Sequence, residues 1–460
     1  MITRVSITAL ALTSLLAASA SAQTNLVQSG DFTYLGSFRL PGGEDRPETF
    51  AYGGNAMTFR ADGDPGGSAD GCPGSLFVMG HDRLPYGELP NGNQIAEVSI
   101  PEPKKAKDPS ALNSAEFIQP LQDAARGLFT AYDEIPRVGM EYVDRQPSGP
   151  HIYLAWGQHF HEDAEKQVAT HAWIEPALTA PKPKGSWYVG DHSLYSVNGY
   201  LFEIPEAWAK GNVDGQFLAT GRYRDGGWSG QGPALYAYMP WADDGGAAPP
   251  SNAHLKSTVL LEYESSRESE DVISKAMKGY QHCDEWEGGA WITTSKGKTA
   301  VLFAGTKGVG AKYWYGWVNP AGPEFPCIET EFVNQFTTCR LANGSPCPAE
   351  DLKGCEGHND YRGWWSSRFA AQFILYSPDD LAAVARGERK PWQPQPYASI
   401  GIDDNLLLNP AHVEEGMIGA GVQRRFRIGS VAYDRAHDLL YVLEPFADGV
   451  KPVIHVWRIQ

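Results

Sequence analysis

Short, mainly apolar runs of the length of β-strands recur along most of this chain. The runs are separated by Gly, Pro, Asn and Asp. Helical periodicity is scarce. We expect short helices at 114–125 and at 378–386, where Ser377 can cap the turn that begins with Pro378. The pattern therefore predicts an all-β fold.

The short strands recur in one order. A polar or aromatic approach leads to Gly, then to a strand of small residues and then to an apolar strand. Copies lie at 50–57, 225–235, 285–292, 361–370 and 426–433, and outer strands are expected at 96–101, 200–205, 234–240 and 373–378. Small residues suit the crowded innermost strands of a propeller, and irregular spacing indicates long loop insertions. We predict a β-propeller of about five or six blades, because a jelly roll or sandwich would not repeat this order.

The two ends of the chain predict how the ring of blades closes. Both 32–40 and 452–459 have strand patterns. If the first segment pairs within the last blade, no open sheet edge remains there. A single domain then covers residues 25–460, with insertions near 104–127 and 321–357.

The first 22 residues have the pattern of a secretory signal peptide. Arg4 precedes an apolar run over residues 5–18, and Ala20, Ser21 and Ala22 form a small-residue exit. That run is too short to span a membrane. We therefore expect residues 1–22 to be removed and the protein to be periplasmic or secreted.

Six cysteines in an exported chain predict disulfides. Four of them cluster where the second insertion is expected, at Cys327, Cys339, Cys347 and Cys355, and the others are Cys72 and Cys283. A zinc site is the alternative, but the chain has no Cys-x-x-Cys pair. The sequence does not choose among the fifteen ways of pairing six cysteines.

Charge and composition narrow the classes of partner. The formal net charge is −17, whereas binding to nucleic acid or to an anionic membrane needs clustered cations. With 14 Trp and 21 Tyr, the chain has ample apolar surface for a folded core. We expect a monomer that binds a carbohydrate or another small polar ligand.

The loops that lead into the innermost strands of a propeller gather over one end of its central channel. Residues just before the Gly-rich strands are therefore the candidates for a site. The candidate catalytic groups are Asp225, Glu285, Glu287, His358 and Tyr361, and the candidate substrate-binding groups are Tyr52, Arg224, Trp228, Asp284, Asp360 and Arg362. Arg222, Arg424 and Arg427 share this position. The Gly288–Gly289 pair would let the backbone approach a ligand closely.

Two mechanisms suit these residue types. A pair of carboxylates can hydrolyse a glycosidic bond, with one as the acid and the other as the nucleophile or base. Alternatively, Arg362 could neutralise a uronic acid while His358 and Tyr361 act as base and acid in an elimination. At the level of fold, the pattern resembles secreted bacterial propellers, several classes of which process polysaccharides. We therefore expect a glycan-cleaving enzyme, a glycoside hydrolase or a polysaccharide lyase.

Two other classes of function stay open. One is a propeller that binds glycans or proteins without catalysis. The other is a metal-dependent hydrolase or oxidoreductase that uses His159 and His161, which would share one face of a strand. No cofactor is expected, although Asp62, Asp64 and Asp70 are candidates for a structural calcium ion. Their spacing is not that of a calcium-binding loop.

Overall fold

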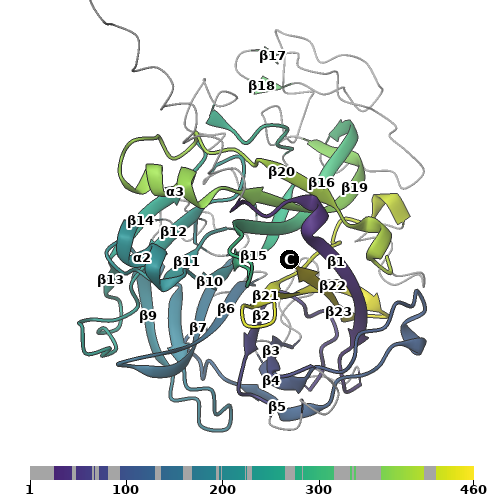
Figure 1. Ribbon diagram of the computed structural model, residues 1–460, viewed down its shortest axis with the longest axis horizontal. Coiled ribbons are helices and arrows are strands. Elements are labelled where there is room, and N and C mark those ends of the chain that lie inside the picture. Colours follow the sequence, from purple (N-terminus) through teal and green to yellow (C-terminus); the bar gives the residue numbers. More distant parts are fainter. Residues whose placement is uncertain are drawn as a thin grey trace, which may run out of the picture.

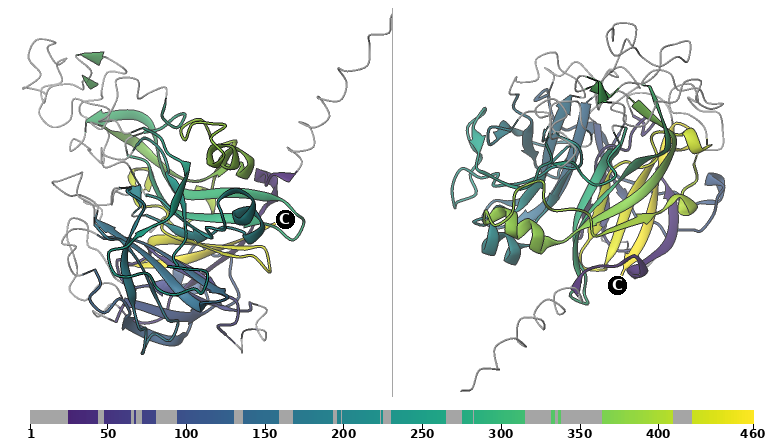
Figure 2. Two further views of the ribbon diagram at one scale, coloured as in Figure 1. Left: turned by 90° about the vertical axis from the view of Figure 1, so that its left-hand side faces the viewer. Right: turned by 90° about the horizontal axis from the view of Figure 1, so that it is seen from above.

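The computed structural model describes residues 25–43, 48–64, 67, 72–80, 94–129, 136–158, 168–192, 196–197, 199–222, 224, 230–264, 275–281, 283–314, 332–333, 336–337, 364–408 and 421–460 (Figures 1 and 2). Within these residues, no helix combines the length and the apolar character that crossing a bilayer would require.

The chain folds into a five-bladed β-propeller, in agreement with the prediction (Figure 1). Blade 1 contains β2 (Met57–Arg60), β3 (Ser75–Met79), β4 (Gln94–Ser99) and β5 (Phe117–Asp123). Blade 2 contains β6 (Pro136–Arg145), β7 (Gly149–Gln158), β8 (His171–Ile174) and β9 (Lys184–Val189), with β13 (His254–Leu255) added parallel to β9. Blade 3 contains β10 (Leu201–Glu203), β11 (Leu218–Thr220), β12 (Leu235–Tyr238) and β14 (Ser257–Leu261).

The remaining two blades are built from the second half of the chain and from its N-terminal strand. Blade 4 contains β15 (Glu285–Thr293), β16 (Thr299–Trp314), β19 (Trp364–Tyr376) and β20 (Ala398–Gly401). Blade 5 contains β21 (Val431–Asp434), β22 (Leu439–Asp448), β23 (Lys451–Ile459) and β1 (Phe32–Arg39). A separate hairpin joins β17 (Phe332–Val333) to β18 (Phe336–Thr337).

The ring closes as the sequence predicts. Strand β1 pairs antiparallel with β23, from Phe32 opposite Ile459 to Arg39 opposite Val453. The N-terminal strand is thus the outermost strand of the last blade, beside the C-terminal strands in Figure 1. The first strands of the blades, β2, β6, β10, β15 and β21, contact one another in a closed circle round the axis.

Two glycines explain why the first strand of blade 4 can lie in this crowded circle. A Cβ on Gly288 would come within 2.5 Å of the Val431 side chain in blade 5. A Cβ on Gly289 would come within 2.5 Å of the Phe202 ring in blade 3. Real Cβ atoms do not approach so closely, so the pair permits contact between neighbouring blades. The suggestion that these glycines make room for a ligand is therefore wrong.

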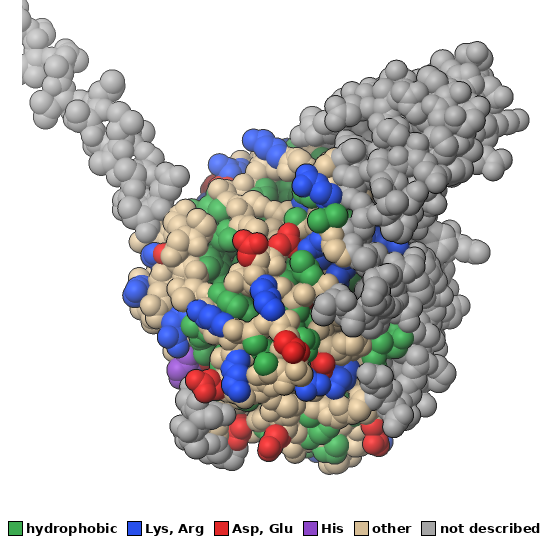
Figure 3. Space-filling view, turned by 90° about the vertical axis from the view of Figure 1, so that its right-hand side faces the viewer, with side chains coloured by type: hydrophobic (Ala, Val, Ile, Leu, Met, Phe, Trp, Pro, Cys, Tyr) green, Lys and Arg blue, Asp and Glu red, His purple; other side chains and the backbone are tan. Residues whose placement is uncertain are grey.

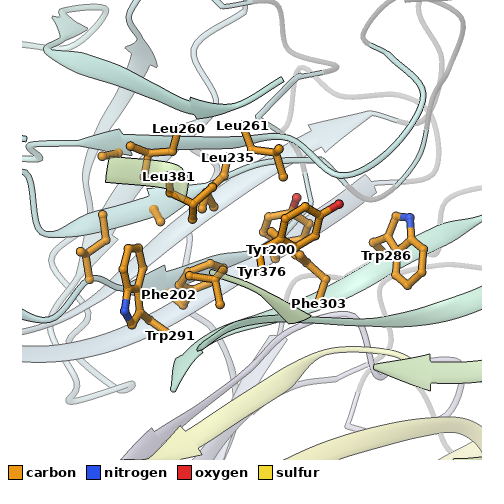
Figure 4. Packing of buried hydrophobic residues seen from close by; sticks show 14 of the residues in the cluster. Tyr200, Phe202, Leu235, Leu260, Leu261, Trp286, Trp291, Phe303, Tyr376 and Leu381 are labelled. Atoms are coloured by element: carbon orange, nitrogen blue, oxygen red, sulfur yellow. The ribbon is translucent and has the colours of Figure 1, made fainter. Parts of the chain in front are cut away.

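The apolar core consists of clusters between neighbouring blades. Each of the five gaps is filled by side chains from the two sheets that face it, which is why strands of a blade are apolar on both faces. Figure 4 shows the cluster between blades 3 and 4, where Phe202, Leu235 and Leu261 face Trp291 and Phe303. Trp291 lies on β15 and is buried in this cluster.

One of the two predicted helices is confirmed and the other is wrong. Helix α3 (Pro378–Ala385) begins after Ser377, whose side chain accepts a hydrogen bond from the Asp379 backbone N–H. Segment 114–125 instead contains β5, the outer strand of blade 1. The order Phe117-Ile-Gln-Pro-Leu121 pairs with β4, and that pairing overrides the weak helical periodicity. The sequence analysis did not identify helix α2 (Glu206–Asn212).

The strand order within two blades differs from the prediction. The copies at 50–57, 285–292 and 426–433 do lead into first strands. Those at 225–235 and 361–370 instead lead into β12 and β19, which are the third strands of their blades. Segment 200–205, predicted as an outer strand, contains β10, the innermost strand of blade 3.

No disulfide joins residues within the described part of the chain. Cys283 is a buried thiol whose Sγ lies 3.3 Å from Ser366 Oγ. The four clustered cysteines, Cys327, Cys339, Cys347 and Cys355, lie outside the described residues, and their predicted oxidation stays a prediction. The insertion predicted at 321–357 also lies outside the described residues, apart from β17 and β18.

Candidate functional site

Strand direction places those predicted site residues that the structure describes at one face of the propeller. Neighbouring strands within a blade are antiparallel, so the first and third strands begin at the same face, which we call the entry face. The loop before β12 therefore opens at the same face as the loops before β2, β15 and β21. Because first and third strands begin at the same face, the error in the predicted strand order of blades 3 and 4 does not change the face at which the site is expected.

Blades 3 and 4 meet at the entry face through an ion pair between two predicted site residues. Arg224 lies in the connection from β11 to β12, and Glu285 is the first residue of β15. Their Nη1 and Oε1 atoms are 3.2 Å apart, and the side chains are only 11% and 6% exposed. Glu287, two residues further along β15, is also buried. The structure thus brings together residues that are 61 positions apart in the sequence.

Asp284, another predicted site residue, precedes Glu285 and is fully buried. Its carboxylate lies 2.8 Å from Lys307 Nζ and accepts hydrogen bonds from the backbone N–H groups of Gly308 and Gln281. Burial raises the pKa of Asp284, while Lys307 and the hydrogen bonds oppose the rise. These contacts fix the approach to β15 and leave little of the carboxylate for a substrate.

Tyr52 and the buried arginines have other partners. Tyr52 adopts a φ of 63° and packs edge to face on Phe446 in blade 5. Arg222 donates to the carbonyls of Gly230 and Gly232, so it fixes its own loop. Arg424 and Arg427 are buried as well, each beside an acidic residue.

Six of the predicted site residues lie outside the described residues: Asp225, Trp228, His358, Asp360, Tyr361 and Arg362. Their roles stay predictions. His159 and His161 also lie outside, and so does Asp70. Among the residues that the structure does describe, no group of three His, Cys, Asp or Glu side chains is placed to hold a metal ion. Asp62 lies 3.0 Å from the Arg60 guanidinium.

A polar group on the first strands near the axis was not among the predicted site residues. Glu141 of β6 accepts hydrogen bonds from Thr58 Oγ1 of β2, at 3.0 Å, and from the backbone N–H of Glu203 at the end of β10, at 3.0 Å. Arg145 and Arg435 lie 3.5 Å and 3.7 Å from the Glu203 carboxylate. A Glu inside the mainly apolar segment 138–143 of an inner strand is the signal that could have revealed the group.

The two carboxyl groups of this cluster, which we call the axial acids, are electrostatically coupled. Burial and the neighbouring Glu203 carboxylate raise the pKa of Glu141 to about 8. Burial also raises the pKa of Glu203, while Arg435 and Arg145 oppose the rise. Glu141 is therefore mostly a neutral acid at pH 7 and can donate a proton.

A substitution at Glu141 should change how stability depends on pH. Because the pKa is higher in the folded than in the unfolded state, wild-type stability should fall as pH rises from about 4.5 to 8, where only the unfolded state releases the proton. Glu141→Gln mimics the neutral acid. It should be nearly neutral at pH 5 and should stabilise the protein by about 1 to 3 kcal/mol at pH 9.

Urea unfolding at pH 5, 7 and 9 measures this difference. Glu116→Gln, at an exposed position of blade 1, is the control and should leave the pH dependence unchanged. Parallel pH profiles of Glu141→Gln and the wild type would contradict the raised pKa.

Charges on the surface do not segregate by sign on the face drawn in Figure 3. Lys and Arg side chains are interspersed with Asp and Glu over the described residues of that face. Comparison with protein-family models and with curated proteins finds no match for the chain.

Proposed function

We propose that this β-propeller is a glycan-cleaving hydrolase whose substrate lies across the entry face where blades 3 and 4 meet. The observation that carries the proposal is the Arg224–Glu285 pair, with Glu287 two residues further along the same strand. Residues two apart on a regular strand are separated by about 6 to 7 Å, within the carboxyl separations of about 5 to 10 Å that glycoside hydrolases use. β15 has a bulge between Glu285 and Gly288, so the separation of these two carboxyl groups departs from the regular value.

Each group has a role in this proposal. The cation of Arg224 orients Glu285, which suits a carboxylate that acts as base or nucleophile. Glu287 is the acid that gives its proton to the glycosidic oxygen as the bond to the anomeric carbon breaks. Water then completes the hydrolysis, and its proton returns to a carboxylate. The two products are a new reducing end and a free hydroxyl group.

A panel of neutral and acidic polysaccharides tests the proposal. New reducing ends without unsaturated sugars would support hydrolysis. Unsaturated products would instead favour elimination by the set around His358, Tyr361 and Arg362. The absence of both products with every glycan, despite measurable binding, would exclude catalysis.

A non-catalytic glycan-binding propeller is the second candidate. It is favoured by the pairing of both Asp284 and Glu285 with cations, because such buried pairs often serve structure alone. Binding without turnover in the same panel would select this alternative.

We also propose that the protein acts after export and loses residues 1–22. The support is the order of Arg4, an apolar run and Ala20-Ser21-Ala22. Intact-mass spectrometry of the exported protein should find a chain that begins at Gln23. A mass that includes Met1 would contradict this expectation.

A further inference from the structure

Three charged side chains gather at the face of the propeller where the first strands end, which we call the exit face. Arg145 is the last residue of β6, Glu203 is the last residue of β10, and Arg435 directly follows β21. The first strands contact one another round the axis, so these side chains from blades 2, 3 and 5 meet close to it. They lie at the opposite end of the first strands from Glu285, which begins β15 at the entry face.

The group keeps hydrogen-bonding capacity that the described part of the protein does not use. The two carboxylate oxygens of Glu203 lie 3.5 Å from Arg145 Nη2 and 3.7 Å from Arg435 Nη2, which is longer than a hydrogen bond. No described residue accepts a hydrogen bond from the Arg145 guanidinium. Arg435 donates to the Trp291 carbonyl and the Thr293 hydroxyl, both through Nη1. Two acceptor oxygens and several N–H donors therefore stand side by side without partners.

A ligand can reach these atoms from solvent. The side chains of Arg145, Glu203 and Arg435 are 17%, 27% and 35% exposed. Their unpaired nitrogen and oxygen atoms remain in contact with solvent. The side chains are also held in place by their surroundings, since the Arg145 guanidinium lies 4.5 Å from the centre of the Phe217 ring. The group is therefore both accessible and preorganised.

The arrangement of charge favours a neutral ligand that both donates and accepts hydrogen bonds. A carboxylate that approaches Arg145 also approaches Glu203, so attraction and repulsion offset each other. An ammonium group at Glu203 meets the same conflict with the two arginines. A hydroxyl group, in contrast, can donate to a carboxylate oxygen and accept from a guanidinium N–H at the same time. Neighbouring hydroxyl groups of one sugar ring can do this at both oxygens of Glu203.

An aromatic side chain beside this group suits the carbon face of a sugar ring. Trp241 follows β12, a third strand, which also ends at the exit face. Its side chain is partly exposed, and its ring centre lies 4.8 Å from that of Phe217, the ring over which Arg145 lies. Trp offers a large, flat apolar surface. We infer that the exit face binds a neutral sugar, with its hydroxyl groups between Glu203 and Arg145 and the carbon face of its ring toward Trp241.

Titration of the protein with the methyl glycosides of glucose, galactose, mannose and xylose tests the inference, with binding followed by NMR. At pH 6 the neighbouring Glu141 stays neutral, because its pKa is about 8. At least one glycoside should bind with a Kd in the millimolar range or below. The uronic acid and the amino sugar of the same configuration should bind at least about threefold more weakly. No binding of any of the four glycosides, or equal or tighter binding of a charged sugar, would overturn the inference.

Substitutions locate the binding site on the protein. Glu203→Gln and Arg145→Gln each remove a charged hydrogen-bonding partner and should raise the Kd at least about tenfold. Glu206→Gln is the matched control, since Glu206 is three positions from Glu203 and pairs with Lys210 at an exposed position of α2. It should leave the Kd unchanged.

A third variant covers the case in which loss of a charge prevents folding. Arg145→Lys keeps the cation beside Glu203 but removes the planar fork of donors, so it should still raise the Kd at least about threefold. Unchanged binding in the folded variants would place the sugar at another site, such as the entry face, and would refute the inference. These titrations measure no turnover, so their result is independent of whether the protein cleaves glycans.

Discussion

Replacing Glu444 by Gln should lower the free energy of unfolding by about 3 to 5 kcal/mol, the cost expected when one partner of a buried ion pair is removed. Glu444 lies on β22 and is fully buried. One carboxylate oxygen accepts from Leu408 N–H and lies 3.3 Å from Arg424 Nη1. The other accepts from Leu407 N–H and lies 2.8 Å from His455 Nε2.

The substitution is severe because every partner of Glu444 is fixed. Gln keeps only one acceptor oxygen, so its amide NH2 group cannot accept the backbone N–H bond that the replaced carboxylate oxygen accepts. The buried cation of Arg424 would lose its counter-charge. His455 is held from its other side by the Tyr34 hydroxyl at 2.9 Å, so the network reaches β1, the strand that closes the propeller.

The penalty should depend on pH. Burial opposes ionisation of Glu444, but the hydrogen bond to His455 and the charge of Arg424 outweigh it, and the pKa falls below its usual value. A carboxyl group with a lowered pKa contributes stability that is present above its unfolded pKa and is lost as pH falls through its folded pKa. The difference between wild type and Glu444→Gln should therefore shrink in strong acid.

Denaturant unfolding followed by tryptophan fluorescence measures the loss. Glu388→Gln is a matched control, because Glu388 also pairs with an arginine, Arg386, but both side chains are about half exposed. This exposed pair should contribute less than about 1 kcal/mol. A loss for Glu444→Gln as small as that of the control would contradict the proposed role of the buried network.

The overall fold could be predicted because two of its features can be recognised from short stretches of sequence. These are the closure of the ring of blades and the crowding of the innermost strands. The segments at 32–40 and 452–459 have strand patterns, and the structure pairs them. The Gly288–Gly289 pair marks a first strand because the neighbouring blades leave no space for a Cβ. Such steric requirements act at single positions, so they can be recognised without knowing the tertiary contacts.

The order of strands within blade 3 could not be predicted in the same way. Strand β10 has only three residues, Leu201–Glu203, and is followed by Pro205, which is also common after an outer strand. Its place at the axis depends on contacts with β6 and β15, which are distant in sequence. Long connections within blades 3 and 4 also placed Gly-rich segments before third strands.

The candidate site was predictable only in part. The positions of the loops were sufficient to predict that Arg224 and Glu285 lie close together. It did not reveal that Asp284 would be buried against Lys307, because that contact depends on the pairing of β15 with β16. The axial acids could not be predicted for a related reason: Glu141 and Glu203 lie within strands β6 and β10, and not at the Gly-rich approaches to the strands.

Replacing Glu287 by Gln should reduce turnover of a cleaved glycan by about a hundredfold or more, if Glu287 is the proposed acid. The variant keeps the size of the side chain, so the loss of turnover should be much larger than any loss of glycan binding, which is measured separately on the same folded variant. Initial rates with the polysaccharide and with a nitrophenyl glycoside measure the effect. The loss should be much smaller for the nitrophenyl substrate, because its leaving group departs without protonation. Equal losses with both substrates would instead assign Glu287 as the nucleophile or base, and unchanged rates would remove it from the mechanism.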